Sequence, residues 1–155
     1  MDDVLKNLLK EEQDLQFTRF NEDTAWQIGN RLVERSKKEQ LSVTIDITRG
    51  DHQLFHASLH GTSADNDEWI KRKVRVVYRF GHSSFYMGQL LKSRGQRLEE
   101  AYFLPQEHYG PVGGCFPVIV RETGVVGTIT VSGLPQEKDH QLVVDVIRDY
   151  LAQEK

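Results

Sequence analysis

Apolar positions in the first quarter of the chain recur with the spacing of amphipathic helices. One apolar stripe runs from Val4 to Leu15 and a second from Ala25 to Val33, with apolar residues three or four positions apart. The polar cluster at 21–24 separates the stripes and supplies an N-cap for the second helix. The pattern therefore predicts a helical N-terminal extension over residues 1–38. Its first stripe requires a partner surface, either this domain's own core or another subunit.

From residue 41 the pattern changes from helical spacing to alternation. Leu41 to Thr48 alternates apolar with polar residues, as a half-buried strand does, and Gly50 marks the turn into a return strand. Residues 110–133 contain two further short apolar strands, joined by a tight turn that ends at Gly124. We therefore expect hairpins to build most of an antiparallel sheet.

Apolar spacing also predicts helices between and after these strands. Residues 70–80 carry an apolar helix face, and the segment 81–84 ends that helix and caps the next one. A stripe from Leu142 to Tyr150 predicts a C-terminal helix. Together the elements predict one α/β (α+β) domain over residues 1–155, with a sheet-and-helix core at 41–152. We expect about five antiparallel strands with helices on the faces of the sheet.

Composition narrows the classes of partner. The formal net charge of −3 gives no general electrostatic reason to bind nucleic acid or an anionic membrane. No apolar run approaches the roughly 18 residues that span a bilayer. Cys115 is the only cysteine, so no intrachain disulfide forms, and the acidic N-terminus lacks the basic start of a signal peptide. These features predict a cytoplasmic protein without nucleic-acid or membrane partners.

Residue patterns for catalysis or metal binding are sparse. Cys115 with His108 as its base is one candidate nucleophile, but a lone cysteine in an apolar run is more often a small buried hydrophobe. His52, His56 and His60 share a face of the return strand, yet members four positions apart lie about 13 Å apart, too far to share one ion. We expect that face to be solvated or at an interface, and we predict no metal site. No phosphate-binding loop, dinucleotide fingerprint or serine elbow is present.

The helix start at residues 82–84 is the clearest candidate for ligand binding. Ser83 and Ser84 cap the helix, and its backbone N–H groups suit an anion such as a carboxylate or propionate. His82 lies beside this helix end, and His108 lies in the loop before the glycine-rich segment. Capping alone selects the same serines, so a purely structural role remains the alternative.

An ordered set of motifs runs through the second half of the chain. It comprises Gly113-Gly114-x-x-Pro117, Gly124-x-x-Gly127, Val131-Ser132-Gly133 and Glu137-x-Asp139. The set resembles the C-terminal signature of the haem-degrading domain family, also called GlcG/HbpS-like, which includes the C-terminal domain of PduO-type proteins. Upstream, Trp69-x-x-x-Lys73 and the Ser83-Ser84 turn resemble its yeast and bacterial branch. The resemblance covers roughly Leu41 to Tyr150 and implies a profilin-like sandwich, homo-oligomers and, in some members, a bound haem or corrinoid.

The resemblance favours an oligomeric protein that binds a small anionic ligand such as haem or a corrinoid. The expected ligand-binding residues are Lys73, His82, Ser83, Ser84, His108, Gly113 and Gly114. In this hypothesis Lys73 offsets ligand charge, the Ser83 cap donates hydrogen bonds, and His82 is the axial ligand. Two alternatives stay open. One is a scaffold that holds partner proteins through its helices, among them the apolar N-terminal stripe, and through a basic stripe of Lys71, Arg75 and Arg79. The other is a haem-degrading enzyme, which no acid–base constellation supports.

Overall fold

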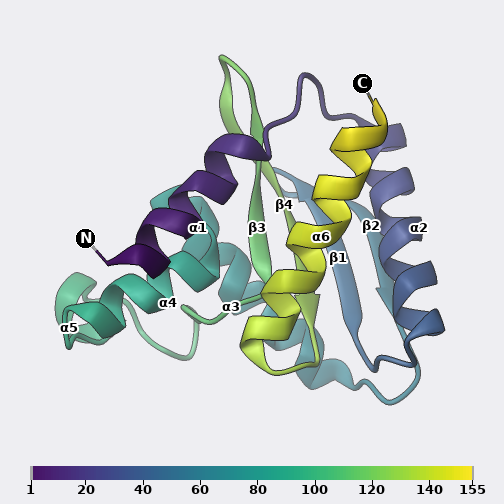
Figure 1. The fold of residues 1–155 in the computed structure, drawn as a ribbon. Helices are drawn as coiled ribbons and strands as arrows, with labels where there is room; N and C mark the ends of the chain where they lie inside the picture. Colours follow the sequence, from purple (N-terminus) through teal and green to yellow (C-terminus); the bar gives the residue numbers. More distant parts are fainter. Residues whose placement is uncertain (1, 155) are drawn as a thin grey trace.

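A four-stranded antiparallel sheet lies at the centre of the computed structural model, which describes residues 2–154 (Figure 1). Its strands are β1 (Thr44–Arg49), β2 (His52–Ser58), β3 (Cys115–Val120) and β4 (Gly124–Ser132), in the order β2-β1-β4-β3. Both predicted hairpins are confirmed, since β1 pairs with β2 and β3 with β4. The sequence predicts about five strands and the sheet has four. Residues 98–102 form a short helix.

One face of the sheet carries the main hydrophobic core. Helices α2 (Glu22–Lys38) and α6 (Gln136–Glu154) pack on this face. Fully buried side chains from both helices and three strands meet there, among them Ile28, Leu32, Ile45, Ile47, Phe116, Val118, Ile129, Val143 and Ile147. The helix of residues 22–38 is therefore part of the core, whereas the sequence assigns it to an N-terminal extension.

Helix α3 (Ala64–Phe80) crosses the opposite face of the sheet. A capping box of Ser63 and Asn66 starts the helix, and Gly81 ends it in the left-handed conformation at φ 74°. Both ends thus follow from local sequence. The position of α3 determines whether the polar residues of the strands beneath it are buried.

A second apolar cluster joins the three remaining helices. Helix α1 (Asp3–Asp14) packs on α4 (Ser84–Ser93), next to the short α5 (Leu98–Tyr102). Buried members of the cluster include Leu5, Leu8, Met87, Leu91 and Leu98. The partner of the first apolar stripe is therefore this domain's own helices. None of the helices within residues 2–154 is both long and apolar enough to cross a bilayer.

Candidate ligand site

The sheet face beneath α3 is polar, although most of it is buried. Side chains that alternate with the core residues of β1 and β4 point to this face, namely Thr44, Asp46, Thr48, Thr128, Thr130 and Ser132. The Tyr78 hydroxyl of α3 lies 3.2 Å from Thr48 Oγ1, which fixes the side of the sheet on which they lie. Burying polar groups costs free energy, so most proteins keep such side chains at the surface. The exceptions are often found at functional sites.

A buried ion pair closes one end of this polar layer. Lys73 Nζ of α3 lies 3.2 Å from Asp139 Oδ2 of α6 and donates to the carbonyl of Val131 at 3.1 Å. The backbone N–H groups of Gly133 and Leu134 also donate to the Asp139 carboxylate. The two charged side chains are only 4% and 3% exposed. The pair therefore ties α3 to the start of α6 across the end of β4.

Burial acts against both charges of this pair. It lowers the pKa of Lys73 and raises the pKa of Asp139, and in each case the attraction to the partner opposes the shift. A buried ion pair is rarely retained for stability alone, because desolvation offsets much of the attraction. A hollow of about 370 Å³ opens beside the pair and is bounded by Trp69, Lys73, Gly113, Gln136 and Asp139.

Gly113 and Gly114 serve close packing next to this hollow. Gly114 has φ 137°, and a Cβ there would meet the carbonyl oxygen of Val131 and Lys73 Nζ. A Cβ at Gly113 would meet the backbone carbonyl oxygen of Gln136, and the Gly113 N–H donates to Gln136 Oε1 at 2.9 Å. These contacts explain why both positions lack a side chain.

The start of α4 is occupied by the chain's own carboxylate. Glu12 Oε2 of α1 accepts the Ser83 N–H at 3.0 Å, and Ser83 Oγ accepts the Tyr86 N–H at 3.0 Å. Ser84 Oγ faces inward, where it accepts the Cys115 N–H at 3.1 Å. An anion of the kind expected here is therefore already supplied by Glu12.

His82 is held by the same carboxylate. Its Nδ1 lies 2.7 Å from Glu12 Oε1, and its ring packs 4.8 Å from the ring of Tyr86. The hydrogen bond to Glu12 raises the pKa of His82, and burial opposes the shift. Since Glu12 fixes the proton on Nδ1, the neutral ring presents Nε2 as its free lone pair, and the side chain is 39% exposed. A carboxylate–imidazole pair of this kind is the usual way to orient a metal-binding histidine.

The structure divides the predicted site residues into separate places. Lys73, Gly113 and Gly114 meet at the ion pair, whereas His82 and Ser83 lie at the start of α4. Ser84 links the two regions through Cys115. His108 stands apart on an outer loop, with its side chain 58% exposed.

The thiol of Cys115 is inert. The residue is fully buried, and burial raises its pKa to about 12. A thiol that stays protonated at neutral pH is a poor nucleophile. The packing role is confirmed, and His108 is not placed to act as its base.

Several polar partners escaped the sequence reasoning. Glu12 lies within the apolar stripe of α1, and a carboxylate at a position that the helical spacing assigns to the buried face is the signal that could have indicated its role. Asp139 belongs to the motif Glu137-x-Asp139, but its contact with Lys73 spans 66 residues. Asp46 and His56 alternate with core residues. This alternation indicates on which face of the sheet the two residues lie, but not which element covers that face.

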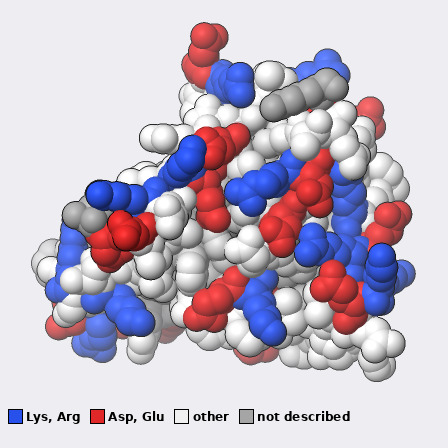
Figure 2. All heavy atoms as spheres, in the orientation of Figure 1, with Lys and Arg blue, Asp and Glu red and all other residues white. Residues whose placement is uncertain are grey.

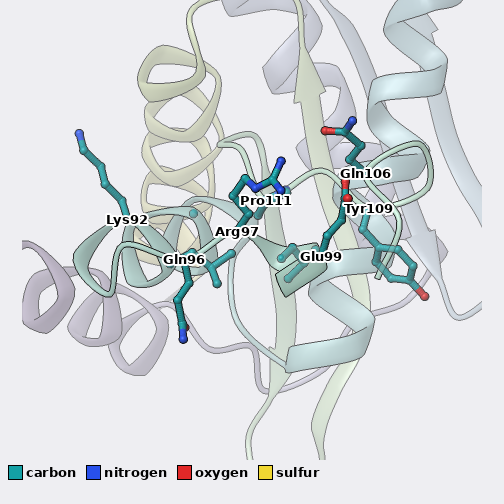
Figure 3. Close-up of a pocket in the computed structure, with 10 residues that line it drawn as sticks. Lys92, Gln96, Arg97, Glu99, Gln106, Tyr109 and Pro111 are labelled. Atoms are coloured by element: carbon teal, nitrogen blue, oxygen red, sulfur yellow. The ribbon is translucent and has the colours of Figure 1, made fainter. Parts of the chain in front are cut away.

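A further hollow of about 300 Å³ lies between α4, α5 and the loop before β3. Leu91, Leu98 and Pro111 give it an apolar floor. Figure 3 shows residues that line this hollow, among which Arg97 extends from the start of α5 and the side chain of Lys92 points away from the others. Arg97 is paired with Glu100 at 3.1 Å and Glu99 also lines the hollow, so its charges favour neither an acidic nor a basic ligand.

Charges of both signs are mixed on one face of the molecule. On the face formed by α1, α6 and α2, Lys and Arg side chains are interspersed with Asp and Glu (Figure 2). That face has no broad patch of one sign that would attract a ligand of the opposite charge.

Comparison with known proteins identifies relatives along nearly the whole chain. A UPF0303 protein of Edwardsiella ictaluri is 48% identical over 150 residues, covering 97% of this chain and 96% of its own. The crystal structure of Ybr137w protein is 31% identical, with a TM-score of 0.91, covering 99% of this chain and 91% of that chain. A PduOC:Heme complex shares the fold at 17% identity, with a TM-score of 0.65, covering 80% of this chain and 89% of that chain. Residues 20–148 match the family described as "Haem degrading protein HbpS-like", and the chain belongs to this HbpS-like family.

Proposed function

We propose that this protein binds a haem-type tetrapyrrole, with His82 Nε2 as the ligand of its metal. The observation that carries the proposal is the pairing of His82 Nδ1 with the buried carboxylate of Glu12 at 2.7 Å. Membership of the HbpS-like family and the fold shared with a PduOC:Heme complex support this class of ligand. The iron of such a group, when bound, supplies electron-transfer or oxygen chemistry.

The donor set fits an axial imidazole. Glu12 is only 5% exposed, so its carboxylate is held firmly and keeps the ring in one tautomer. The negative charge of Glu12 also makes Nε2 a stronger donor to a metal. Tyr86 supports one side of the ring and limits its rotation. These residues orient the imidazole before any ligand arrives, which lowers the entropic cost of binding.

We propose that the protein acts as a homo-oligomer. Trp26 and Phe103 support this, since their side chains are 61% and 89% exposed and gain most from a covering surface. A subunit interface next to the site would also cover part of a ligand too broad for the surface of one chain.

A haemin titration followed by absorbance tests the proposed ligand. We expect a saturable shift of the Soret band for the wild-type protein and its loss in His82→Ala. His108→Ala is the matched control, because His108 is more exposed and its Nε2 lies 3.8 Å from an exposed carboxylate, that of Glu107. This control should retain the shift.

Two results would contradict the assignment. Without a saturable Soret shift in the wild-type protein, the haem ligand is wrong. If the shift survives in His82→Ala but is lost in Arg97→Glu, the ligand lies in the hollow between α4 and α5 instead.

A further inference from the structure

We propose that the hollow between α3 and the edge strand β2 binds a small alkylammonium ion through Asp46 and Asp67. This hollow of about 500 Å³ lies on the side of α3 opposite to the Lys73–Asp139 pair. Its volume falls in the range of roughly 300–1,000 Å³ that is typical of small-molecule pockets. The inference is independent of the proposed tetrapyrrole, because it uses none of the residues around His82.

Asp46 provides the central negative charge. Its side chain is only 7% exposed, yet it lines the hollow. Asp46 Oδ1 accepts from Gln53 Nε2 at 2.6 Å and lies 3.0 Å from His56 Nδ1. Asp46 Oδ2 accepts no hydrogen bond from any residue within 2–154. Asp46 Oδ2 can therefore accept a hydrogen bond from a cationic or N–H-bearing ligand in the hollow that this side chain lines.

His56 places a second carboxylate beside the first. Its Nε2 lies 3.3 Å from Asp67 Oδ1 of α3, within ion-pair distance but not aligned as a hydrogen bond. Asp67 Oδ1 is itself buried and has no hydrogen-bond partner among the described residues. Two carboxylates with unused acceptor capacity therefore flank one imidazole at the wall of the hollow.

The remaining lining favours a cation with an apolar part. Asp51 adds a third carboxylate, while Lys71 pairs with Glu68 at 2.8 Å and so is held by a charge outside the hollow. Ile70 and Val74 of α3 form an apolar wall. A primary ammonium has three donors for the carboxylate oxygens, and its alkyl chain can lie along the apolar wall.

A metal ion is a poorer match than an organic cation. Within residues 2–154, no group of three or more His, Cys, Asp or Glu side chains has the spacing to hold a metal ion. Divalent metals require several ligands at short, fixed distances, whereas an ammonium tolerates looser acceptor geometry.

Isothermal titration calorimetry with putrescine, a diamine with a four-carbon chain, tests the inference on the full chain. We expect saturable binding of putrescine and none of 1,4-butanediol, its neutral counterpart. Asp46→Asn should weaken binding about tenfold, the loss typical of one charge-assisted hydrogen bond. Asparagine keeps an Oδ1 acceptor for Gln53 and His56, so the substitution changes mainly the unpartnered oxygen. Asp65→Asn is the matched control, because Asp65 lies on the same helix but lines the other hollow.

Three outcomes would overturn the inference. The first is no saturable heat with putrescine, and the second is equal binding of the diol. The third is an Asp46→Asn variant with the wild-type affinity and the wild-type far-UV circular dichroism spectrum. A blocked lysine peptide is titrated in parallel. If the peptide binds more tightly than putrescine, a lysine side chain of a protein is the occupant and the small-amine assignment is wrong.

Discussion

Asp139→Ala tests how much the buried ion pair contributes to the fold. The carboxylate of Asp139 pairs with Lys73 Nζ at 3.2 Å and accepts the N–H groups of Gly133 and Leu134. The substitution removes all three contacts and leaves the Lys73 ammonium, 4% exposed, with only the carbonyl of Val131. An uncompensated buried charge is the main consequence.

The expected loss of unfolding free energy follows from these contacts. Removing one partner of a buried pair costs about 3–5 kcal/mol. Gly133 is exposed, so water replaces the acceptor of its N–H and adds little to the loss. Burial already lowers the pKa of Lys73, so the stranded lysine can release its proton, which limits the loss. We therefore expect about 3 kcal/mol, or a fall in Tm of about 6–12 °C for a domain of this size.

Urea unfolding followed by circular dichroism measures this loss. The protomer concentration must be held constant, because the proposed self-association would add to the apparent stability. Lys73→Met in the Asp139→Ala background is the informative second variant, since methionine fills similar space without a charge. The double variant should be more stable than Asp139→Ala by about 1 kcal/mol or more. The defect of Asp139→Ala should also shrink as the pH rises, since the lowered pKa lets the folded state lose a proton that the unfolded state still holds.

Two results would refute this reasoning. One is an Asp139→Ala variant that loses less than about 1 kcal/mol, as expected of an exposed pair. The other is a double variant no more stable than Asp139→Ala, which would show that the stranded charge is not the cause of the loss.

Three other predictions concern the pair at α4, the thiol and the glycine turn. Because the pKa of His82 is raised, its contact with Glu12 should stabilise the fold fully below about pH 6.5 and less as the pH rises through the folded pKa. Glu12→Gln should abolish this pH dependence of the unfolding free energy, measured by urea unfolding across about pH 6–9. Cys115 should fail to react with Ellman's reagent in the native protein and react at once in urea, and rapid native reaction would contradict its burial. Gly114→Ala should lower the unfolding free energy by roughly 2–5 kcal/mol, more than Gly95→Ala. Both glycines have positive φ, but only Gly114 is crowded by neighbouring atoms. Equal losses of stability in thermal unfolding would contradict the packing role.

Local patterns predicted most of the fold. The alternation of Leu41 to Thr48 and the turn at Gly124 determine both hairpins, and the cap at Ser83 determines where α4 begins. Such features depend on residues close in sequence. The number of strands was predicted less well, because a short segment such as residues 98–102, which forms a helix, has too few residues for its period to separate helix from strand.

Long-range polar contacts could not be predicted in the same way. Alternation places Asp46 and His56 opposite the core, and an outward face of a sheet is usually solvated. Here α3 covers that face and turns its polar residues into a buried layer. Glu12 and His82 are 70 residues apart in the sequence, so the residues around each of them do not predict their contact.

The iron–histidine stretching band of the ferrous haem complex, measured by resonance Raman spectroscopy, tests the central claim most directly. Its frequency reports both that an imidazole ligates the iron and how strongly Nδ1 is hydrogen-bonded. We predict such a band in the wild-type protein, a lower frequency in Glu12→Gln, and no band in His82→Ala. A wild-type complex without the band, or a frequency that Glu12→Gln leaves unchanged, would contradict ligation by a His82 that Glu12 orients.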